Sequence, residues 1–176
     1  MDLYLQDLTP DMPGMTIQLR STFAQAAAVC FESQGHIPGV ALIIRGSQAG
    51  AHPAFWEPVS QMMRDSWDDP NEATESGAVG IAVVLVNRLL DKKVMKRARI
   101  GTGFDYWLAE CKEEDSVDMF EKTTRLEVSG MRQADDRTVD ARVEQKLKQT
   151  RRSNNDFPVI VVVVEFGTPQ AKIVSR

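Results

Sequence analysis

Three carboxylates stand at positions where the neighbouring residues predict burial. Glu75 is at the N-terminal end of an apolar helical stripe, Asp105 belongs to the aromatic segment 104–108, and Glu127 lies between two apolar residues. A carboxylate is costly to bury unless a cation, a hydrogen-bond donor or a metal ion compensates its charge. Mg²⁺ is such a partner, because it binds one or two protein carboxylates together with water and phosphate oxygens. The three residues are therefore candidate ligands of a magnesium ion that could activate water for phosphodiester cleavage.

The segment that carries Glu75 has the spacing of an amphipathic helix. Its start is predicted at Asn71 or at Thr74, since either side chain can cap a helix. The apolar residues that share a stripe with Glu75, at spacings of three and four, are Val79, Ala82, Val83, Val86, Leu89 and Leu90. Glu75 is therefore expected at one end of the buried face of this helix.

Two strands are expected to carry the other two carboxylates. The segment 104–108 follows a glycine-rich hairpin turn, and the segment 123–129 is the next strand signal. Side chains alternate between the faces of a strand, so Asp105 faces away from its aromatic neighbours. The same alternation places Arg125 and Glu127 on one face of their strand.

A further helix is predicted over about residues 139–150, with acids near its start and bases near its end, as the helix dipole favours. Arg142, Lys146 and Gln149 follow one another at spacings of four and three residues, so they share one face. The β-branched run 158–164 then predicts a strand that is buried on both faces.

This order of a helical Glu, a strand Asp, a Glu-x-Ser strand, a helix and a strand resembles the core of the PD-(D/E)XK nuclease superfamily, the restriction-endonuclease-like fold. The resemblance covers roughly residues 70–166. It implies that Asp105 and Glu127 bind Mg²⁺, that Glu75 assists, and that metal-activated water hydrolyses a DNA phosphodiester.

The sequence departs from the superfamily pattern at Ser129, where the motif has a lysine that positions or activates the attacking water. A serine cannot supply a positive charge. Lys146 is the candidate replacement, Arg142 is the second choice, and Gln149 could orient a neighbouring group. Arg125, on the face of Glu127, could pair with a carboxylate. The alternative function is a catalytically inactive binding or assembly protein that uses the same fold.

Each carboxylate also has an ordinary structural interpretation. Glu75 can lie in the first turn of its helix, where the dipole favours a negative charge. Asp105 can be a hairpin residue, and Glu127 can be an exposed cross-strand partner of Arg125 or Lys122. Their joint order along the chain favours the functional interpretation.

The net charge of −4 and the isoelectric point near 5.3 provide no global attraction to nucleic acid. DNA is therefore expected to bind through local basic patches, one of which is the run 92–99. The second patch consists of Arg142, Lys146, Lys148, Arg151 and Arg152. We expect both patches beside the carboxylates and the acidic segment 110–118 away from them. A protein partner and a homo-oligomer stay open, and no membrane partner is expected.

The 176 residues predict a mixed α/β protein, as one compact domain. A restriction-endonuclease-like core with a central mixed sheet flanked by helices is expected over residues 53–176. Residues 1–52 are expected to be a β-rich extension, with strands over residues 15–31 and 40–45. Neither a signal-peptide pattern nor an apolar run of transmembrane length occurs, so a cytoplasmic location is expected.

Overall fold

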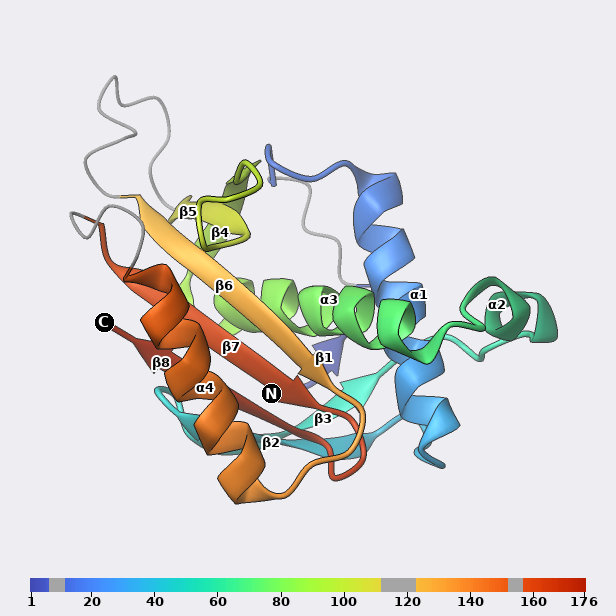
Figure 1. The fold of residues 1–176 in the computed structure, drawn as a ribbon. Helices are drawn as coiled ribbons and strands as arrows, with labels where there is room; N and C mark the ends of the chain where they lie inside the picture. Colours follow the sequence, from blue (N-terminus) through green and yellow to red (C-terminus); the bar gives the residue numbers. More distant parts are fainter. Residues whose placement is uncertain (7–11, 112–122, 152–156) are drawn as a thin grey trace.

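The computed structural model describes residues 1–6, 12–111, 123–151 and 157–176. Within these residues the strands form one eight-stranded sheet, and helices lie against both of its faces (Figure 1). The helices are α1 (Ile17–Ser33), α2 (Gln61–Ser66), α3 (Pro70–Leu90) and α4 (Asp136–Thr150). The strands are β1 (Leu3–Tyr4), β2 (Val40–Gly46), β3 (Gly50–Phe55), β4 (Lys92–Arg97), β5 (Tyr106–Glu110), β6 (Thr124–Met131), β7 (Val159–Glu165) and β8 (Gln170–Ser175).

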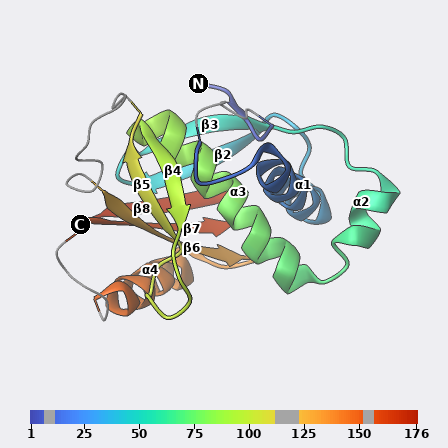
Figure 2. The same cartoon turned by 90° about the horizontal axis from the view of Figure 1, so that it is seen from above.

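The strand order is β1-β3-β2-β8-β7-β6-β5-β4. β4, β5 and β6 are antiparallel neighbours, whereas β6 and β7 are parallel and are joined through α4. A parallel pair needs such a crossover, because a tight turn joins antiparallel strands. α1 and α3 lie on one face of the sheet and α4 lies on the other (Figure 1 and Figure 2). The expected mixed α/β architecture, with a central mixed sheet flanked by helices, is confirmed.

Residues 15–31, which were expected to contain a strand, lie mostly in helix α1, so that prediction is wrong. The N-cap is Thr16, whose hydroxyl accepts the backbone N–H of Leu19 at 3.2 Å. The segment is rich in alanine, the strongest helix former, and small apolar residues without alternation do not distinguish a helix from a buried strand. α1 packs closely on α3, since a Cβ atom at Gly80 would come within 2.7 Å of the carbonyl oxygen of Phe23.

The strand expected over residues 40–45 is present as β2. β2 pairs antiparallel with β3 and parallel with β8. The N-terminal strands therefore continue the sheet that the rest of the chain forms. The division expected after residue 52 falls inside β3.

Helix α3 begins earlier than the sequence predicts. Its N-cap is Asp69, not Asn71 or Thr74, and the Asp69 carboxylate accepts two backbone N–H groups of the first turn at 2.8 and 3.1 Å. Pro70 occupies the first helical position, where its fixed φ is favourable. Glu75 therefore lies in the second turn, and its side chain is exposed. Both its expected place on the buried face and its first-turn interpretation are wrong.

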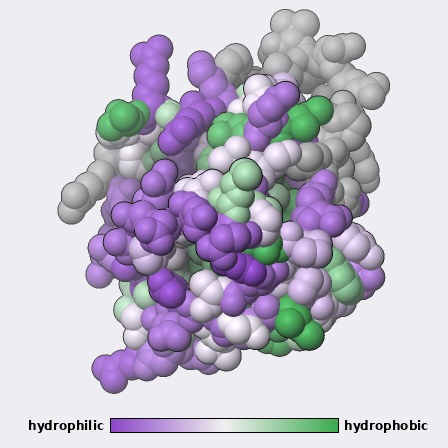
Figure 3. All heavy atoms as spheres, turned by 90° about the vertical axis from the view of Figure 1, so that its right-hand side faces the viewer, coloured by the Kyte–Doolittle hydropathy of each residue, from purple (hydrophilic) through white to green (hydrophobic). Residues whose placement is uncertain are grey.

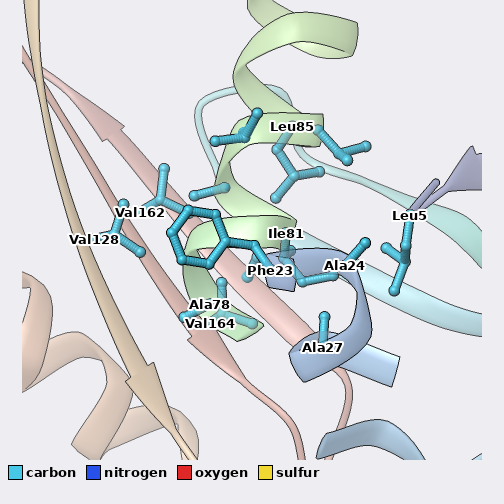
Figure 4. Close-up of a cluster of buried hydrophobic side chains, with 14 of the residues drawn as sticks. Leu5, Phe23, Ala24, Ala27, Ala78, Ile81, Leu85, Val128, Val162 and Val164 are labelled. Atoms are coloured by element: carbon cyan, nitrogen blue, oxygen red, sulfur yellow. The ribbon is translucent and has the colours of Figure 1, made fainter. Parts of the chain in front are cut away.

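Apolar side chains fill the space between the sheet and the α1–α3 pair. Phe23 of α1 and Ile81 of α3 meet Val128 of β6 and Val162 of β7 there (Figure 4). On the opposite face, Val143 and its neighbours on α4 pack on alternate residues of β7. Every residue of β7 is buried, which confirms the strand covered on both faces.

Helix α3 is long and apolar enough to cross a membrane by length and composition. In this fold it lies between α1 and the sheet, and 56% of its apolar stretch is buried. The face of the molecule that carries α1 and α2 is mainly hydrophilic (Figure 3). The surroundings of α3 are therefore those of a helix packed in the core of the fold.

Gly130 of β6 lets the start of α3 lie directly on the strand, because a Cβ atom at this position would come within 2.3 Å of the Thr74 carbonyl oxygen. We expect Gly130→Ala to lower the free energy of unfolding by about 1–3 kcal/mol, since the backbone of α3 has to move. Gly50→Ala is the control, because its Cβ would meet the movable ring of His52 at 3.2 Å. Urea unfolding measures both variants, and an unchanged stability of Gly130→Ala would contradict this account of the contact.

Candidate functional site

Asp105 lies just before β5, where the hydrogen-bonded ladder between β5 and β6 ends. Its backbone N–H donates to the Leu126 carbonyl at 2.8 Å and so extends the antiparallel ladder by one bond. The Asp105 side chain then accepts the backbone N–H of Val128 through Oδ2 at 2.8 Å. β6 continues beyond this point to Met131. The carboxylate is therefore held by a backbone donor at the place where the ladder between the two strands ends.

Glu127 extends from β6 toward α4 and is almost completely buried, with 1% of its surface exposed. Its Oε1 accepts a hydrogen bond from Lys146 Nζ at 2.6 Å and another from Gln149 Nε2 at 3.1 Å. Lys146 and Gln149 come from the one face of α4 that their spacing predicted. Glu127 is therefore not an exposed cross-strand residue.

The environment of Glu127 favours its neutral form. Its pKa is raised from an ordinary 4.5 to about 7, first because burial disfavours the charge and second because the negative Asp105 is adjacent. The hydrogen bond and the charge of Lys146 oppose this rise in pKa. A side-chain hydrogen bond with Asp105 raises the pKa of Glu127 further. The pair is thus an electrostatically unfavourable arrangement that an additional cation would relieve.

A cleft of about 440 Å³ opens beside Asp105 and Lys146, and the buried Glu127 lies behind Lys146, its hydrogen-bond partner, outside the lining. Its walls combine residues of α1, α3, β4, β6 and α4 with Asp105 and Tyr106 at the start of β5. The polar and charged residues of the lining are Glu75, Ser76, Arg97, Asp105, Tyr106, Ser129, Arg142 and Lys146. The fold therefore gathers most of the residues that the sequence singled out around one cleft.

Glu75 reaches the cleft from α3 but does not join the other two acids in a cluster. In the described parts of the chain, no three His, Cys, Asp or Glu side chains are close enough to hold one metal ion together. Asp105 and Glu127 are in contact, whereas Glu75 is an exposed side chain of the cleft wall. Asp105 and Glu127 are therefore the candidate metal ligands, and Glu75 is placed to contact bound water or substrate.

Ser129 lines the cleft next to the cations of α4. Arg142 Nη1 donates to Ser129 Oγ at 3.3 Å, and Lys146 lies one helical turn further along α4. Both cations that could replace a lysine at position 129 thus reach the cleft. Positive charge is therefore present beside Ser129, and it comes from α4.

Arg125 faces α4 as the alternation of the strand predicts, but it lies at the far end of that helix. Its guanidinium donates to the carbonyls of Thr150 at 3.0 Å and Phe157 at 2.7 Å. It also lies 6.0 Å from the centre of the Phe104 ring. Arg125 therefore ties the C-terminal end of α4 to β6 and stands apart from the carboxylate cleft.

The two basic patches contribute to the cleft in part. Arg97 comes from the run 92–99, and Arg142 and Lys146 come from α4. These three cations line the cleft together with Asp105. The local positive charge that DNA would need is therefore present there despite the acidic whole chain.

Other members of these patches have different surroundings. Lys92 pairs with Glu110 of β5, and Arg151 lines a separate cavity at the end of α4. Arg152 and the greater part of the acidic segment, residues 112–118, lie outside the described residues. The expected position of that segment thus stays a prediction.

Arg97 and Tyr106 are cleft residues that sequence reasoning did not single out. Tyr106 is buried, and its pKa is raised by burial and by Asp105, while Arg97 lowers it. The basic run indicated Arg97 only as one of several cations. Nothing local indicated Tyr106, because alternation places it on the strand face opposite Asp105. It reaches the cleft because the cleft opens at the start of β5, where Asp105 and Tyr106 both belong to the lining.

Comparison of the chain with family models, curated proteins and solved structures finds no match. The function must therefore be argued from the geometry and chemistry of the cleft.

Proposed function

We propose that the protein is a Mg²⁺-dependent nuclease that hydrolyses DNA phosphodiesters at the Asp105–Glu127 cleft. The observation that carries the proposal is the contact of Asp105, in a cleft lined by cations, with Glu127, which is buried and bonded to Lys146. A buried carboxylate beside a second acid lowers the stability of the fold unless a cation compensates it, so the pair has no evident role in stability. A site that binds a divalent ion would explain why two acids lie in contact here.

The fold supports the superfamily resemblance. The elements α3, β4, β5, β6, α4 and β7 follow one another in the order from which the resemblance was drawn, and β4 to β7 are neighbours in the sheet. The strand Asp and the Glu of the next strand come together as that resemblance implies. We therefore assign residues 70–166 to a restriction-endonuclease-like core as part of the proposal.

The donor set fits magnesium. Asp105 and Glu127 offer hard carboxylate oxygens, and Mg²⁺ is commonly held by one or two carboxylates with water completing its coordination. When bound there, the ion would supply an activated water and neutralise charge on the phosphate. Asp105 and Glu127 would hold the ion, and Gln149 fixes the orientation of the Glu127 carboxylate through its hydrogen bond of 3.1 Å.

The cations of the cleft have separate tasks. Lys146 donates to Glu127 at 2.6 Å and is 19% exposed, so its ammonium group can also orient a water molecule in the cleft. Arg97 and Arg142 line the same cleft and can bind the phosphate that flanks the cleaved bond. Glu75, on the α3 wall, is placed to bind water or a second ion.

The test compares Lys146→Met with Arg137→Met, which removes an exposed cation from the first turn of α4, outside both basic patches. With Mg²⁺ or Mn²⁺ and linear or supercoiled DNA, we expect Lys146→Met to cut about 100-fold more slowly, because a group that positions or activates water contributes on this scale. Arg137→Met is expected to cut at nearly the wild-type rate. Equal rates for wild type and Lys146→Met would remove the assigned role of Lys146.

The second candidate is a catalytically inactive DNA-binding or assembly protein. Two observations favour it: position 129 carries serine, and the Lys146 ammonium group is already engaged by Glu127. This candidate predicts no cleavage by the wild type with either ion. Binding of DNA or of a protein partner would then be retained in Lys146→Met.

A further inference from the structure

The loop between β4 and β5 is closed by a tight turn whose apex is Ile100. The carbonyl oxygen of Arg99 accepts both the backbone N–H of Thr102 at 3.2 Å and the Thr102 hydroxyl at 2.8 Å. Gly101 has a φ of 93°, a conformation that favours glycine in such turns. Ile100 and Gly101 are therefore the two central residues of the turn, and the turn holds Ile100 at the tip.

Ile100 is fully exposed and is the most exposed large apolar side chain of the described residues. A single exposed apolar residue is common on a protein surface and by itself carries no meaning. Here, however, the neighbours of Ile100 are charged. Lys96, Arg97 and Arg99 are exposed on the same hairpin, and no acidic side chain of the described residues forms an ion pair with them. The tip is thus an apolar side chain on a hairpin that carries three exposed cations.

The base of the hairpin lies directly at the cleft that Asp105 lines. Ala98 N–H donates to the Asp105 carbonyl at 2.8 Å at the base of the hairpin, and Arg97 lines the cleft. Gln149, which also bonds Glu127, lies 3.5 Å from the Gly103 carbonyl oxygen. Figure 2 shows the loop protruding beyond the sheet next to α4. Ile100 lies two positions after Ala98, so the tip lies within roughly 10 Å of the base at ordinary strand rise.

We propose that the hairpin 98–104 is a DNA-contacting element that inserts Ile100 between neighbouring base pairs of a duplex. Lys96, Arg97 and Arg99 contact the phosphates beside the insertion. Proteins that wedge an apolar side chain into the minor groove combine it with flanking cations and bend the duplex. This inference rests on the proposed DNA function and deepens it, because it makes the substrate a duplex that is deformed next to the cleft.

Duplex DNA is the occupant that the observations favour. The exposed cations match the phosphate charge, and an apolar tip gains little from phosphate alone but is buried between bases. Single-stranded DNA would instead be bound by aromatic side chains on which bases stack. The tip from Ala98 to Gly103 carries no aromatic residue.

The experiment measures binding of the full chain to a duplex of about 20 base pairs that carries 2-aminopurine, in EDTA so that cleavage cannot occur. Ile100→Ser removes the apolar tip. Ile37→Ser is the matched control, because Ile37 is a 75% exposed isoleucine in another turn. Wild type and Ile37→Ser are expected to bind equally and to raise the fluorescence of 2-aminopurine as its stacking is lost. Ile100→Ser is expected to bind about 10-fold more weakly without the fluorescence rise.

Three results would overturn the inference: equal binding and fluorescence for Ile100→Ser and wild type, no duplex binding by the wild type, or tighter binding of the single strand than of the duplex. The proposed nuclease function fails separately. If the wild type binds the duplex through Ile100 but does not cut it with Mg²⁺ or Mn²⁺, the hairpin inference stands and the nuclease does not. If the wild type cuts and Ile100→Ser binds normally, the reverse holds.

Discussion

Asp105→Asn is expected to abolish metal-dependent DNA cleavage, by about 1000-fold or more, while the protein stays folded. The asparagine carbonyl can still accept the backbone N–H of Val128, which Asp105 Oδ2 accepts at 2.8 Å. The end of the β5–β6 ladder is therefore kept. What disappears is the negative charge beside Glu127, which the site needs to hold a divalent ion.

Cleavage rates with Mg²⁺ and Mn²⁺, together with Mn²⁺ binding followed by electron paramagnetic resonance, measure this effect. Asp65→Asn is the control, because Asp65 lies on α2 and accepts a hydrogen bond from Gln61 at 2.8 Å, away from the cleft. Thermal unfolding verifies that both variants are folded. A folded Asp105→Asn variant that cuts DNA at the wild-type rate would remove the metal site from the mechanism.

Glu127→Gln is expected to make the protein more stable at pH 8 and inactive. The pKa of Glu127 is about 7 in the folded protein and about 4.5 ordinarily, so between these values the folded state holds a proton that the unfolded chain releases. Stability therefore falls as the pH rises through this interval. By pH 8 the loss is complete and is on the order of 3 kcal/mol. Glutamine removes this loss but also loses the charge that pairs with Lys146.

The net expectation is a gain of about 1–2 kcal/mol at pH 8 and little or no gain at pH 5, measured by urea unfolding at both values. Asp140→Asn should behave in the opposite way. The pKa of Asp140 is lowered, chiefly by its hydrogen bond from Lys172, so its contribution is present at pH 8 and is lost in acid. A Glu127→Gln variant that is less stable than wild type at pH 8 would contradict the raised pKa of Glu127.

A gain in stability on loss of the acid would have a functional meaning. A buried carboxylate beside a second carboxylate costs stability in the free protein, and such local conflict is common where binding requires it. Lys146 and Gln149 compensate the conflict in part through their bonds to Glu127. A bound cation would remove the remaining loss of stability.

Local periodicity is sufficient to predict which side chains α4 contributes to the site. The spacing of Arg142, Lys146 and Gln149 places them on one face of a helix, and alternation places Glu127 on one face of β6. Both patterns depend on neighbours in the chain, and the contacts of Lys146 and Gln149 with Glu127 agree with them. The same holds for β7, whose unbroken β-branched run corresponds to a strand buried on both faces.

The segment 15–31 cannot be assigned to a helix or a strand from its local pattern alone. Its apolar and alanine-rich residues are compatible with a strand or a helix, and the contact with α3 at Gly80 is a long-range feature that local spacing does not contain. Likewise, the cap at Asp69 places Glu75 in the second turn of α3, and Glu75 is exposed although it shares helical spacing with buried residues. Which residues of a stripe are buried depends on the elements packed against the helix, and local spacing does not contain that information.

The sequence by itself determined which residue types could do chemistry, their order along the chain, and the faces on which Glu127 and Lys146 lie. Only the tertiary structure decided that Asp105 contacts Glu127 and that the pKa of Glu127 is raised. It also decided that Arg125 binds the C-terminal end of α4 and not the cleft. The physical reason is that faces and turns follow from bonded neighbours. Burial, charge pairing and the parting of β5 from β6 depend on segments that are distant in the chain and meet only when the sheet is assembled.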